Sequence, residues 1–282
     1  MKTRMKTPMK TPMKTGFVLA LSALFLGGCN HSGNDGGSGS WLSRFSLGTG
    51  VLRVQTGGVQ YGDPAEQVKG SDRLANQWRP IPDIRSVVVQ GPVDVVLRQD
   101  GNEGVTVHAD DNIVPLITTD VGADGILRIG IRPHTAFRMA HPIGVTLFAP
   151  RLESIVMSAG GINCAEFEGD RLRVELRGAG SARFDEIRAK ELSVRLAGAG
   201  GISVAGSVPE QNFEIDGSGS VDAGDLAGQN VTVRIAGRGS ATLWAIETLK
   251  ADVTGAGNVH YRGMATVTRT GTGSGTVQRQ PQ

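Results

Sequence analysis

The sequence predicts an all-β protein that folds as a parallel β-helix, a solenoid with coils of about 20 residues. Two observations lead to this fold class. A glycine turn recurs at a nearly constant spacing through residues 151–277, and short stretches of alternating apolar and polar residues flank the turns. A fixed period of this length is typical of stacked coils, and alternation with period two is typical of half-buried strands.

The glycine turns mark one corner of each coil. Most have the form Gly-x-Gly followed by Ser, Gly or Asn, and they begin at residues 158, 178, 198, 217, 237, 255 and 271. Successive turns are therefore 20, 20, 19, 20, 18 and 16 residues apart. Glycine lets the backbone adopt positive φ, and without a Cβ atom it lets neighbouring coils approach closely. These turns follow no strand-to-helix step, so we do not interpret them as phosphate-binding loops.

Alternating segments on both sides of each turn predict two strands per coil, such as Leu172–Leu176 before a turn and Ala182–Phe184 after it. Aligning the repeats on the turns gives two ladders of inward-facing residues that should form a continuous apolar core. Before the turns the inward residues are Val156, Leu176, Leu196, Ile215, Ile235 and Val253. After the turns they are Cys164, Phe184, Val204, Ala223, Leu243, Tyr261 and Val277.

A column of charged residues is expected to face outward, next to the first ladder. Its members are Glu175, Arg195, Glu214, Arg234 and Asp252, so the sign of the charge alternates from coil to coil. Stacked strands lie about 4.8 Å apart, close enough for neighbouring members to form ion pairs. Each exposed pair stabilises the fold by about 0.2–1 kcal/mol. We interpret the column as a solvated charge ladder in preference to a ligand groove.

The amino terminus has the features of an export signal over residues 1–28. Five basic residues precede Phe17–Leu26, an apolar run that is too short to cross a bilayer as a resident helix. The following Leu26-Gly27-Gly28-Cys29 closely resembles the lipobox of bacterial lipoproteins. The resemblance implies cleavage before Cys29 and lipidation of its thiol and new amine, including palmitate-type acylation. Asn30 after the cysteine implies export to the outer membrane, and an ordinary signal peptide is the alternative.

Composition excludes some classes of protein. The 282-residue chain has a formal charge of +2, but removing the signal leaves 24 basic against 27 acidic residues, a charge of −3. That balance gives no reason to expect nucleic acid as a partner. Hydrophobic residues make up 39%, too many for a disordered chain. With Cys29 lipidated, Cys164 has no disulfide partner, and we expect it to be buried as a small apolar residue.

Four segments are expected. Residues 1–28 are the signal, and 29–40 are the lipidated cysteine and a flexible Gly/Ser/Asn-rich tether. Residues 41–80 give no firm pattern, so irregular structure is expected there, although Gly50–Val54 resembles a strand. Residues 81–282 form the β-helix domain, with regular coils at 151–277. Strands are also expected at 87–89, 93–97, 105–107, 126–129 and 145–148, and a short helical turn at 113–116.

Residues 81–277 resemble a known family. The stretch Ile81–Gly91, the segment Val93–Val95 and the run Gly125–Ile129, followed by the glycine-turn coils, are similar to the putative auto-transporter adhesin head GIN domain. This resemblance implies a right-handed β-helix in exported, often lipid-anchored bacterial proteins. It carries over no catalytic motif, and residues 41–80 have no counterpart in it.

Candidate functional residues are few. Asp216, Asp222 and Asp225 lie in one coil, and carboxylates on one face of a β-helix are used by polysaccharide-degrading enzymes. Turn stabilisation is the favoured reading of these aspartates, with Asp216 and Asp222 kept as weak binding candidates. Phe137 and Met139 lie in a Pro-bounded loop and form either an exposed contact patch or, preferentially, a buried cap on the first coil. The histidines show no metal-ligand spacing, and no metal or cofactor is expected.

The favoured function is a non-catalytic, lipid-anchored envelope protein that presents its β-helix as a binding or adhesion surface. Its partners would be the membrane through Cys29 and a glycan or another envelope protein. A polysaccharide-degrading enzyme on the same scaffold and a structural spacer without a ligand remain open as alternatives.

Overall fold

The structure is a computed structural model that describes residues 44–47, 50–55, 58–61, 67–139 and 141–281. The expected signal, Cys29 and the tether lie outside the described residues. Apart from one 3-10 turn, the described elements are all strands, and the prediction of an all-β parallel β-helix is confirmed.

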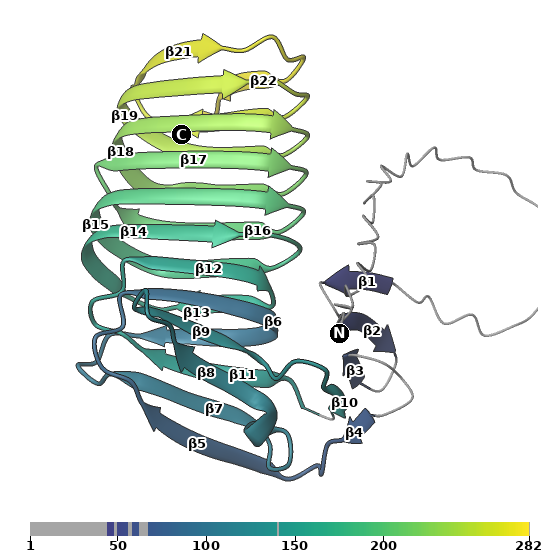
Figure 1. Ribbon diagram of the computed structural model, residues 1–282. Helices are drawn as coiled ribbons and strands as arrows, with labels where there is room; N and C mark the ends of the chain where they lie inside the picture. Colours follow the sequence, from purple (N-terminus) through teal and green to yellow (C-terminus); the bar gives the residue numbers. More distant parts are fainter. Residues whose placement is uncertain (1–43, 48–49, 56–57, 62–66, 140, 282) are drawn as a thin grey trace, which may run out of the picture. The chain divides into compact units, whose positions relative to one another are not determined.

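Residues 154–279 form the regular stack, in which each coil contributes one strand before its glycine corner and one after it (Figure 1). Neighbouring strands are parallel and in register over nearly their whole length, as expected for coils of constant length. Three of them, β15, β18 and β19, continue around the second corner of a coil, which lies between the strand after one glycine corner and the strand before the next. The strands are β12 (Ser154–Ala159), β13 (Gly161–Cys164), β14 (Phe167–Leu176), β15 (Ser181–Gly198), β16 (Gly201–Ser207), β17 (Glu210–Gly217), β18 (Ser220–Gly237), β19 (Ser240–Val253), β20 (Asn258–Arg262), β21 (Thr266–Thr270) and β22 (Thr276–Arg279).

The inward ladder before the corners is confirmed for five of its six members. Leu176 pairs with Leu196, which pairs with Ile215, and the column continues through Ile235 to Val253. Each of these side chains is at most 1% exposed. Burying a side chain of this size contributes about 1.5–3 kcal/mol, so the column is a main source of the stability of the stack.

The first ladder position was misplaced at Val156. Met157 is the residue that pairs with Leu176, and it is 1% exposed, whereas Val156 lies opposite Glu175 on the outer face. The reason is the length of the first corner. Three residues separate Met157 from the strand that begins at Gly161, and every later corner has four.

The last member of the second ladder, Val277, was also misplaced. Val277 pairs with Val259, and Arg279 takes the place next to Tyr261. This coil contains two overlapping Gly-x-Gly motifs, at 271–273 and 273–275. The second motif is the one that stacks on the preceding corner, at Gly255 and Gly257. A Cβ atom on Gly275 would lie 1.8 Å from the carbonyl oxygen of Gly257.

The beginning of the stack is built out of sequence order. Strand β6 (Ser86–Arg98) pairs in parallel with β12 and β13 on one side and with β9 (Ile126–Ile131) and β11 (Ile143–Phe148) on the other. Antiparallel strands then cover β9 and β11. These strands are β5 (Leu74–Pro80), β7 (Gly104–Asp110) and β8 (Ile117–Val121), and the 3-10 turn η1 (Val114–Leu116) precedes β8.

A second, five-stranded sheet contains β1 (Arg44–Leu47), β2 (Gly50–Gln55), β3 (Gly58–Tyr61), β10 (Ala136–Met139) and β4 (Gln67–Lys69). The first three strands form an antiparallel meander, β3 is antiparallel to β10, and β10 is parallel to β4. Residues 41–80, for which the sequence predicts irregular structure, thus contain five strands where they are described. Strands β1, β2 and β3 pair with one another, and the expected strand Gly50–Val54 lies within β2. Strands β4 and β5 pair with β10 and β7, far along the chain, so no local pattern indicates them.

The glycine corners bring successive backbones into direct contact. Gly217 has φ of 143°, and a Cβ atom there would lie 2.3 Å from the carbonyl oxygen of Gly198 in the coil before it. Gly237 repeats this relation with Gly217 at 2.2 Å. A side chain at these positions would have to push two coils apart.

Replacing Gly217 with alanine should therefore destabilise the stack. The backbone conformation alone costs about 1–3 kcal/mol, and the clash with Gly198 adds to this. Chemical denaturation of Gly217→Ala and of Gly125→Ala measures the difference. Gly125 also has positive φ, at 71°, but nothing lies within 4 Å of its Cβ position. Equal losses in the two variants would contradict a steric role for the corner.

Candidate functional site

The surface at the second corners of the early coils is hollowed in two adjoining places, which together we call the corner groove. The larger hollow has a volume of about 720 Å³ and the smaller one about 560 Å³. Glu168 lines both, so it forms the wall between them. The first is lined by Val96, Leu97, Arg98, Gln99, Asp100, Pro150, Ala165, Glu166 and Glu168, and the second by Glu168, Gly169, Asp170, Arg188, Ala189, Lys190, Ser207 and Pro209.

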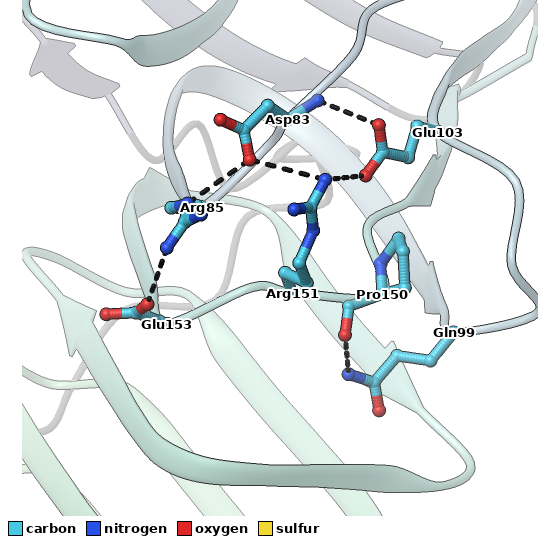
Figure 2. A network of polar contacts seen from close by, with 7 residues as sticks. All are labelled: Asp83, Arg85, Gln99, Glu103, Pro150, Arg151 and Glu153. Carbon is cyan, nitrogen blue, oxygen red and sulfur yellow. Dashed lines mark hydrogen bonds and ion pairs between the residues drawn. The ribbon is translucent and has the colours of Figure 1, made fainter.

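Gln99 fixes the position of the shared wall. Its Nε2 donates to the carbonyl oxygens of Pro150 and Glu168, both at 3.1 Å, and its Oε1 accepts from the backbone N–H of Glu168 at 2.7 Å. The side-chain amide thereby satisfies both backbone groups of Glu168, as a neighbouring strand would do. Figure 2 shows the contact between Gln99 and Pro150. The backbone of the groove wall is consequently held in place before any ligand arrives.

A network of five charged residues continues from Pro150 (Figure 2). Nη2 of Arg151 lies 2.9 Å from Oε1 of Glu103 and 3.4 Å from Oδ1 of Asp83. Arg85 joins the same Asp83 oxygen to Glu153, at 3.2 and 3.6 Å. The backbone N–H of Asp83 and the guanidinium of Arg151 hold the pKa of Glu103 below its ordinary value. The network brings three carboxyl groups together with two guanidinium groups.

Charges of both signs line the corner groove itself. Arg188 bridges Glu166 at 2.8 Å and Glu186 at 2.7 Å, and Lys190 lies 2.6 Å from Asp170. All these side chains are about half exposed or more, so each pair contributes little to stability. They remain available to exchange one partner for a polar ligand. Glu168, in the shared wall, forms no ion pair in the part of the chain that the structure describes.

The outward charge ladder has the predicted register. Glu175 lies opposite Arg195, Arg195 opposite Glu214, Glu214 opposite Arg234, and Arg234 opposite Asp252. The ion pairs from Arg195 to Glu214 and from Arg234 to Glu214 and Asp252 measure 3.1, 3.7 and 4.0 Å. The paired carboxylates of the ladder are only 11–41% exposed, against 47–78% for those at the groove, so the ladder is the less suitable ligand site.

Glu175 begins this ladder but finds its ion-pair partners within its own strand and corner. Its carboxylate lies 2.8 Å from Arg177 and 3.7 Å from Arg173. The hydrogen bond from Arg177 lowers the pKa of Glu175 from its ordinary value, and the charges of Arg173 and Arg195 act in the same direction. The residue is only 8% exposed, so its ionisation depends on these arginines.

The three aspartates considered for catalysis each have a different partner. Asp216 pairs with Arg195 at 2.9 Å, and Asp225 pairs with Arg262 at 3.0 Å. Asp222 accepts a hydrogen bond from the backbone N–H of Gly224 at 3.2 Å, which is a turn-stabilising contact. Asp216 thus extends the charge ladder, and the three carboxylates are not directed at a common point by these contacts.

Phe137 and Met139 are buried, at 0% and 4% exposure, and they belong to the same core cluster as the coils. They do not form an exposed contact patch in this structure. Cys164 is likewise buried at 2%, and burial raises the pKa of its thiol to about 11. A thiol in this state is a poor nucleophile at neutral pH.

A pair that sequence reasoning missed is Asp110 with His141. Nδ1 of His141 lies 3.0 Å from Oδ1 of Asp110, whose side chain is fully buried, and 3.8 Å from Oδ1 of the exposed Asp72. Oδ2 of Asp110 has no hydrogen-bond partner among the residues that the structure describes. Within the described residues, His, Cys, Asp and Glu form no group able to hold a metal ion. His134, the other histidine of this loop, is exposed and has positive φ.

No helix in the described ranges has the length and apolar character that crossing a membrane requires. Cys29, the expected lipidation site, lies outside the described residues.

Comparison with known proteins gives one family and a group of similar folds. Residues 84–265 match the family described as putative auto-transporter adhesin, head GIN domain. A putative adhesin from Bacteroides fragilis has 23% identity and a TM-score of 0.70, over 76% of this chain and 100% of that one. A putative adhesin from Parabacteroides merdae has 23% identity and a TM-score of 0.61, over 77% and 100%.

A third solved structure of this fold, named as a putative lipid binding protein, comes from Parabacteroides distasonis. It has 20% identity and a TM-score of 0.63, over 77% of this chain and 100% of that one. At these identities the likeness shows the fold. No curated protein matches the chain.

The environment of Glu175 predicts a pH dependence of stability. A carboxylate with a lowered folded-state pKa stabilises the fold fully above its ordinary pKa of about 4.3, and this stabilisation is lost as the pH falls through the folded-state value. Glu175→Gln should therefore be less stable than the parent protein at pH 7, with the difference shrinking towards pH 3. Unfolding free energies across this range measure it. Glu191→Gln, an exposed residue outside the ion pairs of the described chain, is the control. A constant difference would contradict the assignment.

Proposed function

This chain belongs to the family of the putative auto-transporter adhesin head GIN domain, and from that premise we propose that it is a lipid-anchored protein of the cell envelope that presents its β-helix as a non-catalytic binding surface. The corner groove is the proposed ligand site. The observation that carries this choice is the pair of hollows that adjoin at Glu168, on a backbone already held by Gln99.

The chemistry of the groove suits an extended polar chain. Its ion pairs are exposed, and hydroxyl groups of a glycan can both donate to carboxylates and accept from Arg188 and Lys190. Because neighbouring coils repeat at about 4.8 Å, the side of the stack offers regularly spaced contacts to a repeating polymer. A glycan is therefore the ligand class that we favour, with another envelope protein as the alternative partner.

Anchoring is supported by the sequence of the amino terminus, where a short apolar run leads directly to Gly-Gly-Cys29. The outer membrane is the proposed destination because Asn30 follows the cysteine. The name of the Parabacteroides distasonis structure, a putative lipid binding protein, supports a binding role for a protein with this fold.

Charge reversal at the shared wall of the groove tests the proposed site. The full chain, purified in detergent, is applied to an array of bacterial polysaccharides, together with Glu168→Arg and the control Glu247→Arg. Glu247 is exposed on β19 and does not line the groove. We expect Glu168→Arg to weaken binding about tenfold, the equivalent of about 1.4 kcal/mol, and Glu247→Arg to leave it unchanged.

If both variants lose binding equally, or if neither loses it, the corner groove is not the ligand site. The same polysaccharides are then analysed for a decrease in chain length after incubation. Depolymerisation that disappears in Asp216→Ala and Asp222→Ala would replace the binding hypothesis with an enzymatic one. Circular dichroism of Asp216→Ala must accompany this assay, because that variant also breaks the ion pair with Arg195.

The anchor predicts that Cys29→Ala is released from the membrane. In a bacterial host, the parent protein should sediment with the membrane fraction, and the mass of its amino-terminal peptide should include three acyl chains. Cys29→Ala should lose this added mass and enter the soluble or precursor fraction. Cys164→Ala is the matched control and should remain membrane-bound. An unmodified Cys29 in the mature protein would contradict the proposal.

A further inference from the structure

The last coil of the described stack has an open edge. Strand β21 pairs with β19, and β22 pairs with β20, each in parallel and on one side (Figure 1). The opposite end of the stack differs, because β5, β7 and β8 cover it with antiparallel strands. Among the described residues no strand pairs with the outer side of β21 or β22, so their backbone N–H and C=O groups on that side can pair with another strand.

Two of the core columns that reach this edge end in an arginine. Along one column Val233 is followed by Ala251 and then Arg269, and along the other Leu243 is followed by Tyr261 and then Arg279. The two arginines occupy inward positions, but no described coil covers them and both are exposed.

The residue two places before each arginine is a valine. Val267 and Val277 are partly buried and pack against the core. Strands β21 and β22 thus present the same inward pattern, Val-x-Arg, to whatever lies beyond them.

The charge of this edge is unbalanced. After Asp252, residues 253–281 contain Arg262, Arg269 and Arg279 and no Asp or Glu. Arg262 is paired with Asp225, whereas Arg269 and Arg279 form no ion pair with a carboxylate among the described residues. Nη2 of Arg269 donates to the carbonyl oxygen of Gly275 at 2.6 Å, and Nη2 of Arg279 lies 3.2 Å from the sulfur of Met264, which is 79% exposed. The guanidinium groups are held at the edge without neutralisation.

We propose that this edge is a docking site for an extended, acidic strand of another protein, which adds to β21 or β22 as a further rung. Its inward residues would follow the pattern apolar-x-Asp/Glu, so that the apolar side chain covers Val267 or Val277 and the carboxylate pairs with Arg269 or Arg279. Strand addition uses the free backbone groups for affinity and alternate side chains for specificity. A carboxylate facing an arginine adds a charge-assisted hydrogen bond.

The same features disfavour other occupants. A second copy of this chain would bring the arginines of two edges together, and inward-pointing charges of one sign prevent like edges from pairing. A purely apolar strand would leave both guanidinium groups without a partner. The site is distinct from the corner groove, so its test is independent of the proposed glycan binding.

A pair of labelled peptides tests the proposal with the full chain. One peptide repeats Thr-Val-Thr-Glu, and its control repeats Thr-Val-Thr-Lys. We expect the acidic peptide to bind at least about tenfold more tightly by fluorescence anisotropy. It should also slow amide hydrogen exchange within 266–270 or 276–279, because only strand addition protects these edge N–H groups.

A charge swap separates this site from general attraction. The double variant Arg269→Glu/Arg279→Glu should reverse the preference and bind the lysine peptide. Arg238→Glu, at an exposed corner in an earlier coil, should keep the original preference. Equal binding of both peptides, binding without amide protection, or a dimer of the parent protein that the double variant abolishes would each overturn the proposal.

Discussion

The fold depends on the contact between one glycine corner and the next. At these corners the backbone of one coil lies so close to the carbonyl oxygen of the coil before it that a Cβ atom has no room, as at Gly217 over Gly198 and Gly237 over Gly217. Because the corners are stacked, the strands that leave them begin at the same height and stay in register. The register in turn directs Leu176, Leu196 and Ile215 into one column. Core packing, the charge ladder and the free edge all follow from this alignment.

Charges have different roles on different surfaces of the stack. Along the outward ladder, Arg195 is held between Glu214 and Asp216, and its charge is neutralised by residues one coil away. In the corner groove, Arg188 and Lys190 are paired but more exposed, at 54% and 83% of their side chains. An ion pair in water stabilises little and is readily exchanged. The groove is therefore better suited than the ladder to bind a ligand, although the ladder is the clearer pattern in the sequence.

The sequence predicts the middle of the stack well because the information there is local. From Leu172 to Val253 the period stays between 18 and 20 residues, so each residue's partner lies about 20 positions away. The errors lie at the two ends. Val156 was assigned to the core although it faces outward, because the first corner is one residue shorter than the others. Val277 was assigned to the wrong core column because two Gly-x-Gly motifs overlap in the last coil. The corner groove was not predicted at all, because its wall depends on Gln99 meeting Glu168, which is 69 residues further along the chain. Neither residue belongs to a recurring motif.

The central place of β6 has a consequence for the order in which the chain can assemble. This strand is hydrogen-bonded on one flank by β9 and β11 and on the other by β12 and β13, all of which are encoded after it. A nascent chain that has emerged only to residue 125 therefore offers β6 none of these four neighbours. Later coils differ, because the strands with which each one pairs belong to the preceding coil and have already been synthesised. Synthesis thus delivers β6 long before its neighbours are available. Pairing Ser86 with Ser154 closes 68 residues of chain, against about 20 in a regular coil, so this closure has a larger entropic cost than the addition of a later coil.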